Sequence, residues 1–89
     1  MNKKLIEILA CPIDKHFPLE LVELTSKDEI IYEGIIFCSK CSRYYPIIEE
    51  IPIMLLDELR DKNQDIEFLN KYKNVLPDKI MTKGLPWHL

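Results

Sequence analysis

"FCSKCSRYYPI" (residues 37–47) and "LACPID" (residues 9–14) are the stretches that decide the fold of this chain. The first contains a complete Cys-x-x-Cys pair, and the second places a cysteine and an aspartate at the same spacing. A Cys-x-x-Cys on a tight turn directs two thiolates at one tetrahedral ion, and a second such turn completes the shell. Asp can also bind zinc, through oxygen, although it is a harder ligand than a thiolate. The spacing predicts a structural zinc site made of Cys11, Asp14, Cys38 and Cys41.

The same residue types are compatible with alternative roles. His16, five residues after Cys11, could supply the fourth ligand in place of Asp14. Asp14 could instead accept hydrogen bonds from the amides of its own turn, with no metal bound. The cysteines could also be small core residues, because Cys is among the most buried residue types. A disulfide framework is disfavoured, since three cysteines cannot all pair within one chain.

Length and composition indicate one small folded domain. The chain has 89 residues, of which 47% are hydrophobic and 30% charged, and a core of this size gains from an internal cross-link. The net charge of −3 disfavours a free-standing nucleic-acid binder, because it gives no overall attraction to phosphate. Basic residues near the cysteine segments either form a local patch or are ordinary solvated surface, which we favour: Lys3, Lys4, Lys15, Lys40 and Arg43.

Hydrophobic patterning predicts two hairpins between a short N-terminal helix and a longer C-terminal one. Residues 18–24 and 29–37 are rich in β-forming residues and flank "TSKDE" as the turn, and residues 44–48 and 51–56 flank a second turn at 49–50. We expect the second hairpin to be covered on both faces, because it is almost entirely apolar. The predicted fold class is α+β: a zinc-ribbon-like antiparallel β core with a short N-terminal helix ending before Pro12 and a C-terminal amphipathic helix.

The C-terminal part has the pattern of one amphipathic helix. Its apolar stripe repeats at spacings of three and four and comprises Ile66, Leu69, Tyr72, Val75 and Leu76. Asn63 or Asp65 is the expected cap, and Pro77 the expected end. We expect the final residues, "TKGLPWHL", to dock on this domain or on a partner. We therefore predict a β domain at 1–56 and a helical extension at 57–89, packed on that domain or on a partner.

The apolar run at 51–56 is the candidate partner-binding segment. Proline lacks an amide donor, so a strand with a proline inside it belongs at a sheet edge. An exposed apolar edge invites aggregation unless another strand covers it, and a partner strand would do so. The alternative is that these residues belong to the core of the domain or lie under the following helix. The candidate contact residues are Ile51, Pro52, Ile53, Met54 and Leu55.

These motifs, in this order, resemble the small zinc-ribbon activator subunit shared by several SAM-dependent methyltransferases, its archaeal members in particular. The resemblance covers residues 4–56 through "LIEILACPID", "KHFPLEL", "FCSKCSRYYPI" and "IPIMLL", and covers the tail weakly. Two residues depart from the pattern: Asp14 stands in place of a cysteine, and Glu50 in place of a turn glycine. The first departure bears on zinc binding, the second on the turn type.

The resemblance implies a subunit without chemistry of its own. Such a subunit binds a methyltransferase catalytic subunit by adding a strand edge and covering an apolar surface, which keeps the enzyme soluble and its cofactor pocket formed. The enzymes served modify tRNA, rRNA and a translation release factor. The expected state is a cytoplasmic heterodimer that reaches nucleic acid only through its partner and self-associates through its bare edge when free. No segment is apolar enough for a signal peptide or membrane span.

Three other function classes are distinguishable from this one. A zinc-ribbon RNA-binding module would use basic and aromatic residues near the second turn, with Lys40 and Arg43 as RNA-facing candidates. An independent enzyme is disfavoured, because no catalytic triad or phosphate-binding glycine loop has recognisable spacing. Rubredoxin-like iron needs four thiolates, and the chain has three cysteines.

Overall fold

Four antiparallel strands form one sheet in the computed structural model, which describes residues 1–88. The strand order is β1-β2-β3-β4, so β4 lies at an edge and pairs with β3 alone. This arrangement confirms the predicted α+β fold class with an antiparallel core and flanking helices. The elements are the 3₁₀ helix η1 (Lys3–Glu7), β1 (Glu20–Lys27), β2 (Ile30–Phe37), β3 (Tyr44–Ile48), β4 (Ile51–Pro52), η2 (Asp57–Leu59), α1 (Lys62–Lys71) and α2 (Asp78–Lys83).

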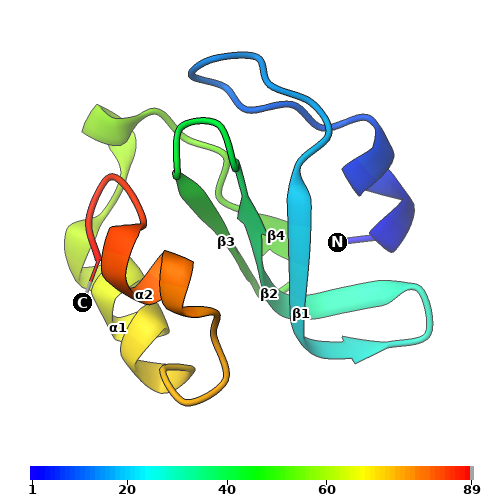
Figure 1. The fold of residues 1–89 in the computed structure, drawn as a ribbon. Coiled ribbons are helices and arrows are strands. Elements are labelled where there is room, and N and C mark those ends of the chain that lie inside the picture. The colour runs from blue at the N-terminus through cyan, green and yellow to red at the C-terminus, as the bar shows by residue number, and fades with distance from the viewer. Residues whose placement is uncertain (89) are drawn as a thin grey trace.

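Both faces of the central strands are buried. Side chains alternate along a strand, so Ile36 and Tyr45 enter one hydrophobic cluster while Ile35 and Tyr44 enter the other. The N-terminal segment covers the first face and the α1–α2 helices cover the second, and Figure 1 shows these segments on opposite sides of the sheet. The prediction that the second hairpin is covered on both faces is therefore correct for its first strand, residues 44–48, and wrong for residues 51–56, where Ile51 and Leu55 are exposed.

The first hairpin is tighter than the sequence pattern predicts. The expected five-residue turn "TSKDE" contains only two turn residues, because β1 runs on through Lys27, which pairs with Ile30. Register shifts between Glu23 and Ser26 accommodate the extra length. Asp28 starts the turn with a positive φ of 54°, a conformation that Asp tolerates better than most residues. Pairing with β2 overrides the turn-like composition of residues 25–27.

The second hairpin ends sooner than predicted. Of the expected strand 51–56, only Ile51–Pro52 is strand, although the Ile53 amide still donates to the Pro46 carbonyl at 2.8 Å. A proline on β3 shortens this ladder, because Pro46 lacks the amide that would complete its pair with Ile53. The prediction of an edge position is confirmed.

The predicted C-terminal helix is two helices. The first ends at Lys71 instead of continuing to Pro77, and Pro77 precedes the second, α2, which the hydrophobic pattern does not indicate. A Pro is favourable at a helix start, because its fixed φ suits the first turn. Leu76 is buried as expected, but Val75 lies in the connection between the helices and is 66% exposed.

Asp61 caps α1, so the prediction of Asn63 or Asp65 is wrong. The Asp61 carboxylate accepts the Gln64 amide at 3.1 Å. Asp65 is fully buried instead and lies 2.8 Å from Nη2 of the equally buried Arg60. Burial raises the pKa of Asp65, while the guanidinium opposes that rise. A buried ion pair of this kind is invisible in the hydrophobic pattern.

The C-terminal segment returns to its own domain. Leu85 bridges to Arg43, and its amide donates to the Ser42 carbonyl at 2.8 Å. The Trp87 indole donates to Asp65 at 3.1 Å. Of the two docking sites considered from sequence, these residues use this domain. The last residue, Leu89, lies outside the described residues, and the division into 1–56 and 57–89 stays a prediction.

Candidate metal centre

The first cysteine turn is a tight loop closed by its own backbone. The Lys15 amide donates to the Cys11 carbonyl at 2.9 Å, and the Cys11 amide donates to the His16 carbonyl at 3.0 Å. Lys15 has a positive φ of 62°. These bonds fold residues 11–16 back on themselves and turn the Cys11 and Asp14 side chains toward the sheet end.

The second cysteine turn repeats this geometry at equivalent positions. The Ser42 amide donates to the Cys38 carbonyl at 2.8 Å, the Cys38 amide donates to the Arg43 carbonyl at 2.8 Å, and Ser42 has a φ of 64°. Neither of the two residues with positive φ, Lys15 and Ser42, is a glycine, so the composition does not indicate that both turns share this left-handed conformation. The two turns therefore present their side chains in matching ways, although one carries an aspartate.

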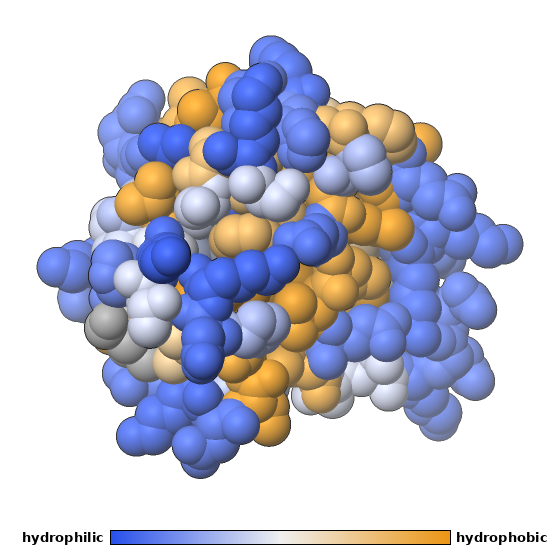
Figure 2. All heavy atoms as spheres, in the orientation of Figure 1, coloured by the Kyte–Doolittle hydropathy of each residue, from blue (hydrophilic) through white to orange (hydrophobic). Residues whose placement is uncertain are grey.

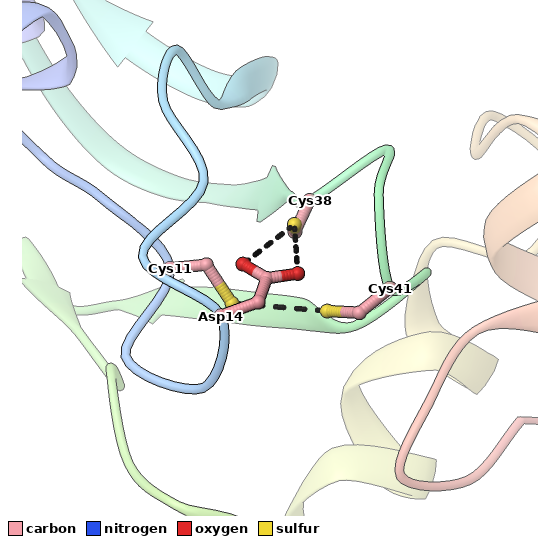
Figure 3. Close-up of side chains that lie close together, drawn as sticks. All are labelled: Cys11, Asp14, Cys38 and Cys41. Atoms are coloured by element: carbon pink, nitrogen blue, oxygen red, sulfur yellow. Dashed lines mark hydrogen bonds between the residues drawn. The ribbon is translucent and has the colours of Figure 1, made fainter.

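All four predicted ligands meet at one point between the turns. Their ligand atoms lie within 4.8 Å of one another. As Figure 3 shows, Cys11 faces Cys41, with 3.7 Å between the sulfurs, and the Asp14 carboxylate faces Cys38 at 3.6 and 3.7 Å. Zn–S bonds of about 2.3 Å in a tetrahedron place two sulfurs about 3.8 Å apart and a sulfur and an oxygen about 3.6 Å apart. The observed separations fit a tetrahedral ion.

The protonation states suit a site that exchanges protons for a metal ion. Burial raises the pKa of Cys38 to about 12, so without an ion this residue stays a thiol at neutral pH. A hydrogen bond from the His16 amide lowers the pKa of Asp14, so the carboxylate is ionised. A bound cation would displace the thiol protons, because the thiolate is the ligand.

Asp14 combines two of the roles considered from sequence. Its Oδ1 accepts the His16 amide at 2.9 Å, which is the turn-stabilising alternative, and the same carboxylate faces the thiols. In the part of the chain that the structure describes, the group able to hold a metal contains Asp14 and lacks His16. Cys11 and Cys38 are also part of the hydrophobic core, so core packing and ligand geometry coexist.

The candidate partner-binding residues lie together at the β4 edge with unequal exposure. Ile51 is 62% exposed and Leu55 40%, whereas Pro52, Ile53 and Met54 are half-buried. Met54 packs against the cluster that contains Cys11, so this residue belongs partly to the core. In Figure 2, hydrophobic residues reach the surface of the molecule between hydrophilic ones. The edge is thus exposed in part, mainly at its two ends.

The two RNA-facing candidates differ in what they contact. Lys40 is exposed at the tip of the second turn. Arg43 instead donates to Asp57 through Nε at 2.9 Å and Nη2 at 2.7 Å, and the pKa of Arg43 is raised by Asp57 first and by Cys41 second. This bidentate pair, which the sequence analysis did not predict, connects the second turn to η2 and engages the guanidinium group of Arg43.

No helix within residues 1–88 has the length and apolar character needed to cross a bilayer. The sheet, the flanking helices and the two cysteine turns together define a small zinc-ribbon-like protein whose cluster of three thiols and a carboxylate could hold a metal ion.

Comparisons with known proteins identify the family. The sequence model of the family described as Trm112p-like protein matches residues 2–50. A protein of Nitrosococcus oceani described as a UPF0434 protein is 37% identical over 67 residues, which cover 75% of this chain and 98% of the relative. A UPF0434 protein of Methylobacillus flagellatus is 43% identical over 60 residues, covering 67% and 85%. The chain belongs to the Trm112p-like family.

One solved structure links this fold to methyltransferases. A chain from the complex between the Haloferax volcanii Trm112 methyltransferase activator and a candidate methyltransferase matches with a TM-score of 0.64 and 33% identity. The match covers 67% of this chain and 100% of that chain. The resemblance stated from sequence is therefore confirmed.

Proposed function

We propose that this chain is a non-catalytic subunit that binds, stabilises and activates SAM-dependent methyltransferases acting on tRNA, rRNA or a translation release factor. Family membership and the likeness to an activator found in complex with a candidate methyltransferase support this role. The observation that carries it is β4, a short edge strand with exposed apolar residues at both ends of its segment.

The edge has backbone groups available for an added strand. Hydrogen bonding alternates along an antiparallel strand, and the Ile53 amide is directed at β3. The backbones of Pro52 and Met54 consequently face away from the sheet. A partner strand would bond to the Pro52 carbonyl and to the amide and carbonyl of Met54, because Pro52 has no amide donor. Ile51 and Leu55 would supply apolar contact area. The proposed state is a cytoplasmic heterodimer in which nucleic acid is bound by the partner. The uncovered edge leads us to expect self-association of the free subunit.

We further propose that Cys11, Asp14, Cys38 and Cys41 hold a structural zinc ion. Zinc would cross-link the two cysteine turns through metal–ligand bonds. Cys38 directly follows β2 and Cys41 precedes β3, so the cross-link would fix one end of the central hairpin. The same end carries Arg43, whose bond to Asp57 sets where the chain leaves the partner-binding edge.

A pair of matched variants tests the proposed edge. Ile51→Asp places a charge at a site that is 62% exposed in the free chain, so the fold should survive while strand pairing with an apolar partner is lost. Val75→Asp is the control, because Val75 is similarly exposed but lies between the helices. Tagged proteins would be purified from the native cell and their co-purifying proteins identified. We expect methyltransferases with the wild type and Val75→Asp, and none with Ile51→Asp. Equal recovery with all three would place the interface elsewhere.

A further inference from the structure

Two adjacent tyrosines of β3 differ in what their hydroxyls contact. Tyr44 and Tyr45 are both fully buried, on opposite faces of the sheet. The Tyr45 hydroxyl lies 3.2 Å from the Cys11 sulfur, whereas the Tyr44 hydroxyl has no hydrogen-bond partner among residues 1–88. Buried hydroxyls normally form a hydrogen bond, and the Tyr45 hydroxyl has a candidate metal ligand as its partner.

The proton of this hydrogen bond belongs to the tyrosine when the sulfur is a ligand. A tyrosine hydroxyl has an ordinary pKa of about 10, so at neutral pH it carries a proton that it can donate. A thiolate has no proton and can only accept. The Tyr45 hydroxyl therefore donates to the Cys11 sulfur. The opposite direction, with the sulfur as donor, is not available once the thiol has lost its proton.

The charge of the cluster explains why such a donor matters. Three thiolates and one carboxylate carry four negative charges, of which a divalent cation balances two. Two of the thiolates are fully buried, where uncompensated charge is costly. The Tyr45 hydroxyl gives Cys11 a donor from outside its turn.

We propose that Tyr45 is a positioning residue of the metal centre: its hydroxyl donates to the Cys11 thiolate, aims the sulfur at the ion and offsets part of the excess negative charge. This inference rests on the proposed metal site. Partners of metal ligands typically contribute about 10- to 100-fold to metal affinity. Tyr45 would thus act on the ion through Cys11 without contacting the ion itself.

The test compares Tyr45→Phe with Tyr44→Phe. Each variant removes one hydroxyl from a fully buried ring in the same strand, and only the first hydroxyl contacts sulfur. Zn²⁺ affinity would be measured by chelator competition, and Co²⁺ loading would report the sulfur-to-cobalt charge-transfer band. We expect Tyr45→Phe to bind Zn²⁺ about 10- to 100-fold more weakly and to shift the band to longer wavelength, because an unbonded thiolate releases electron density more readily. Tyr44→Phe should match the wild type in both.

Equal affinity and an unshifted band in Tyr45→Phe would overturn the role of Tyr45 while leaving the metal site intact. A wild type that binds neither ion would overturn both. Should Tyr45→Phe fail to fold, the wild type loaded with Cd²⁺ gives an independent readout: the Tyr45 hydroxyl proton should exchange slowly enough to be seen by NMR. Rapid exchange in the loaded protein would contradict the hydrogen bond.

Discussion

Asp14 is the residue on which the proposed metal site depends most. Its carboxylate takes the position of a fourth thiolate and is held there by the His16 amide. We expect the wild type to carry about one zinc per chain, and Asp14→Ala to bind more weakly because one ligand is lost. Asp14→Cys should bind zinc more tightly than the wild type, because a thiolate is the softer ligand.

Metal analysis of protein purified without added zinc, followed by chelator competition, checks this order of affinities. Lys15→Ala is a suitable control, because it alters the same turn without removing a ligand. A wild type that lacks metal yet is fully folded would contradict the structural role of zinc.

Glu50 is a local source of strain. Both residues of the β3–β4 turn have positive φ, 50° at Glu49 and 71° at Glu50, as in a type I′ turn, whose second position favours glycine. Glu50→Gly should stabilise the fold by about 1 kcal/mol, because glycine adopts this conformation without the steric cost of a Cβ. Thermal denaturation at fixed metal content should show a melting temperature about 4–8 °C higher. Glu58→Gly, at an exposed residue without positive φ, should give no such gain.

Sequence spacing predicted the four clustered residues, because each cysteine turn is a local structure whose two candidate ligands lie three residues apart. The partners of those residues were not predictable in this way. Tyr45 reaches Cys11 from 34 positions away, and Asp57 reaches Arg43 from 14. Such contacts depend on strand register and on the path of the chain. Apolar patterning indicates which face of the sheet a side chain occupies, but not which distant residue it contacts. The positive φ at Glu50 likewise follows from the two-residue turn and not from the identity of Glu.

At the scale of elements, Glu33 joins β2 to α1. It accepts hydrogen bonds from Tyr72 and from Lys71, the latter at 3.0 Å. The Tyr72 hydroxyl is the main cause of the lowered pKa of Glu33, with Lys71 contributing less. A carboxylate with a lowered pKa stabilises the fold fully above its ordinary pKa, and that contribution is lost as pH falls through the lower value of the folded state.

Glu33→Gln should therefore cost on the order of 0.5 kcal/mol at pH 7, after allowance for solvent screening. The difference from wild type should shrink as the pH falls below about 4.5, the ordinary pKa of Glu33. Melting temperatures from pH 7 to pH 3 check this trend. Glu20→Gln removes a more exposed ion pair with Lys79 and should have a smaller effect throughout. A difference that grows on acidification would contradict the expected sign.

Element boundaries were predictable where hydrophobic periodicity alone decides them. The central strands β2 and β3 follow the pattern closely. The early end of β4 and the break between α1 and α2 do not, because they depend on the pairing of Pro46 with Ile53 and on Pro77 starting a new helix. An apolar run cannot distinguish a strand from an extended segment that packs on the core, as Met54 does.

At the scale of the molecule, one sheet separates the cysteine turns from the helices α1 and α2. One face and its end carry the cysteine turns, and the other face is covered by α1 and α2 (Figure 1). The buried Arg60–Asp65 pair and Trp87 hold these helices. The family match ends at residue 50, so the helices lie beyond it. The chain leaves the proposed partner-binding edge between these two regions, and the Arg43–Asp57 pair connects this segment to the turn that carries Cys38 and Cys41.

Methyl transfer by the methyltransferase that co-purifies with the tagged chain is the decisive measurement for the activator role. That enzyme and this chain would each be assayed alone and then together, with labelled SAM and with tRNA, rRNA or release factor as acceptor. We expect no transfer by this chain alone, little by the enzyme alone, and a severalfold rise when the two are combined, which Ile51→Asp fails to produce. Transfer by this chain alone, or an enzyme rate that does not change on its addition, would contradict the activator role.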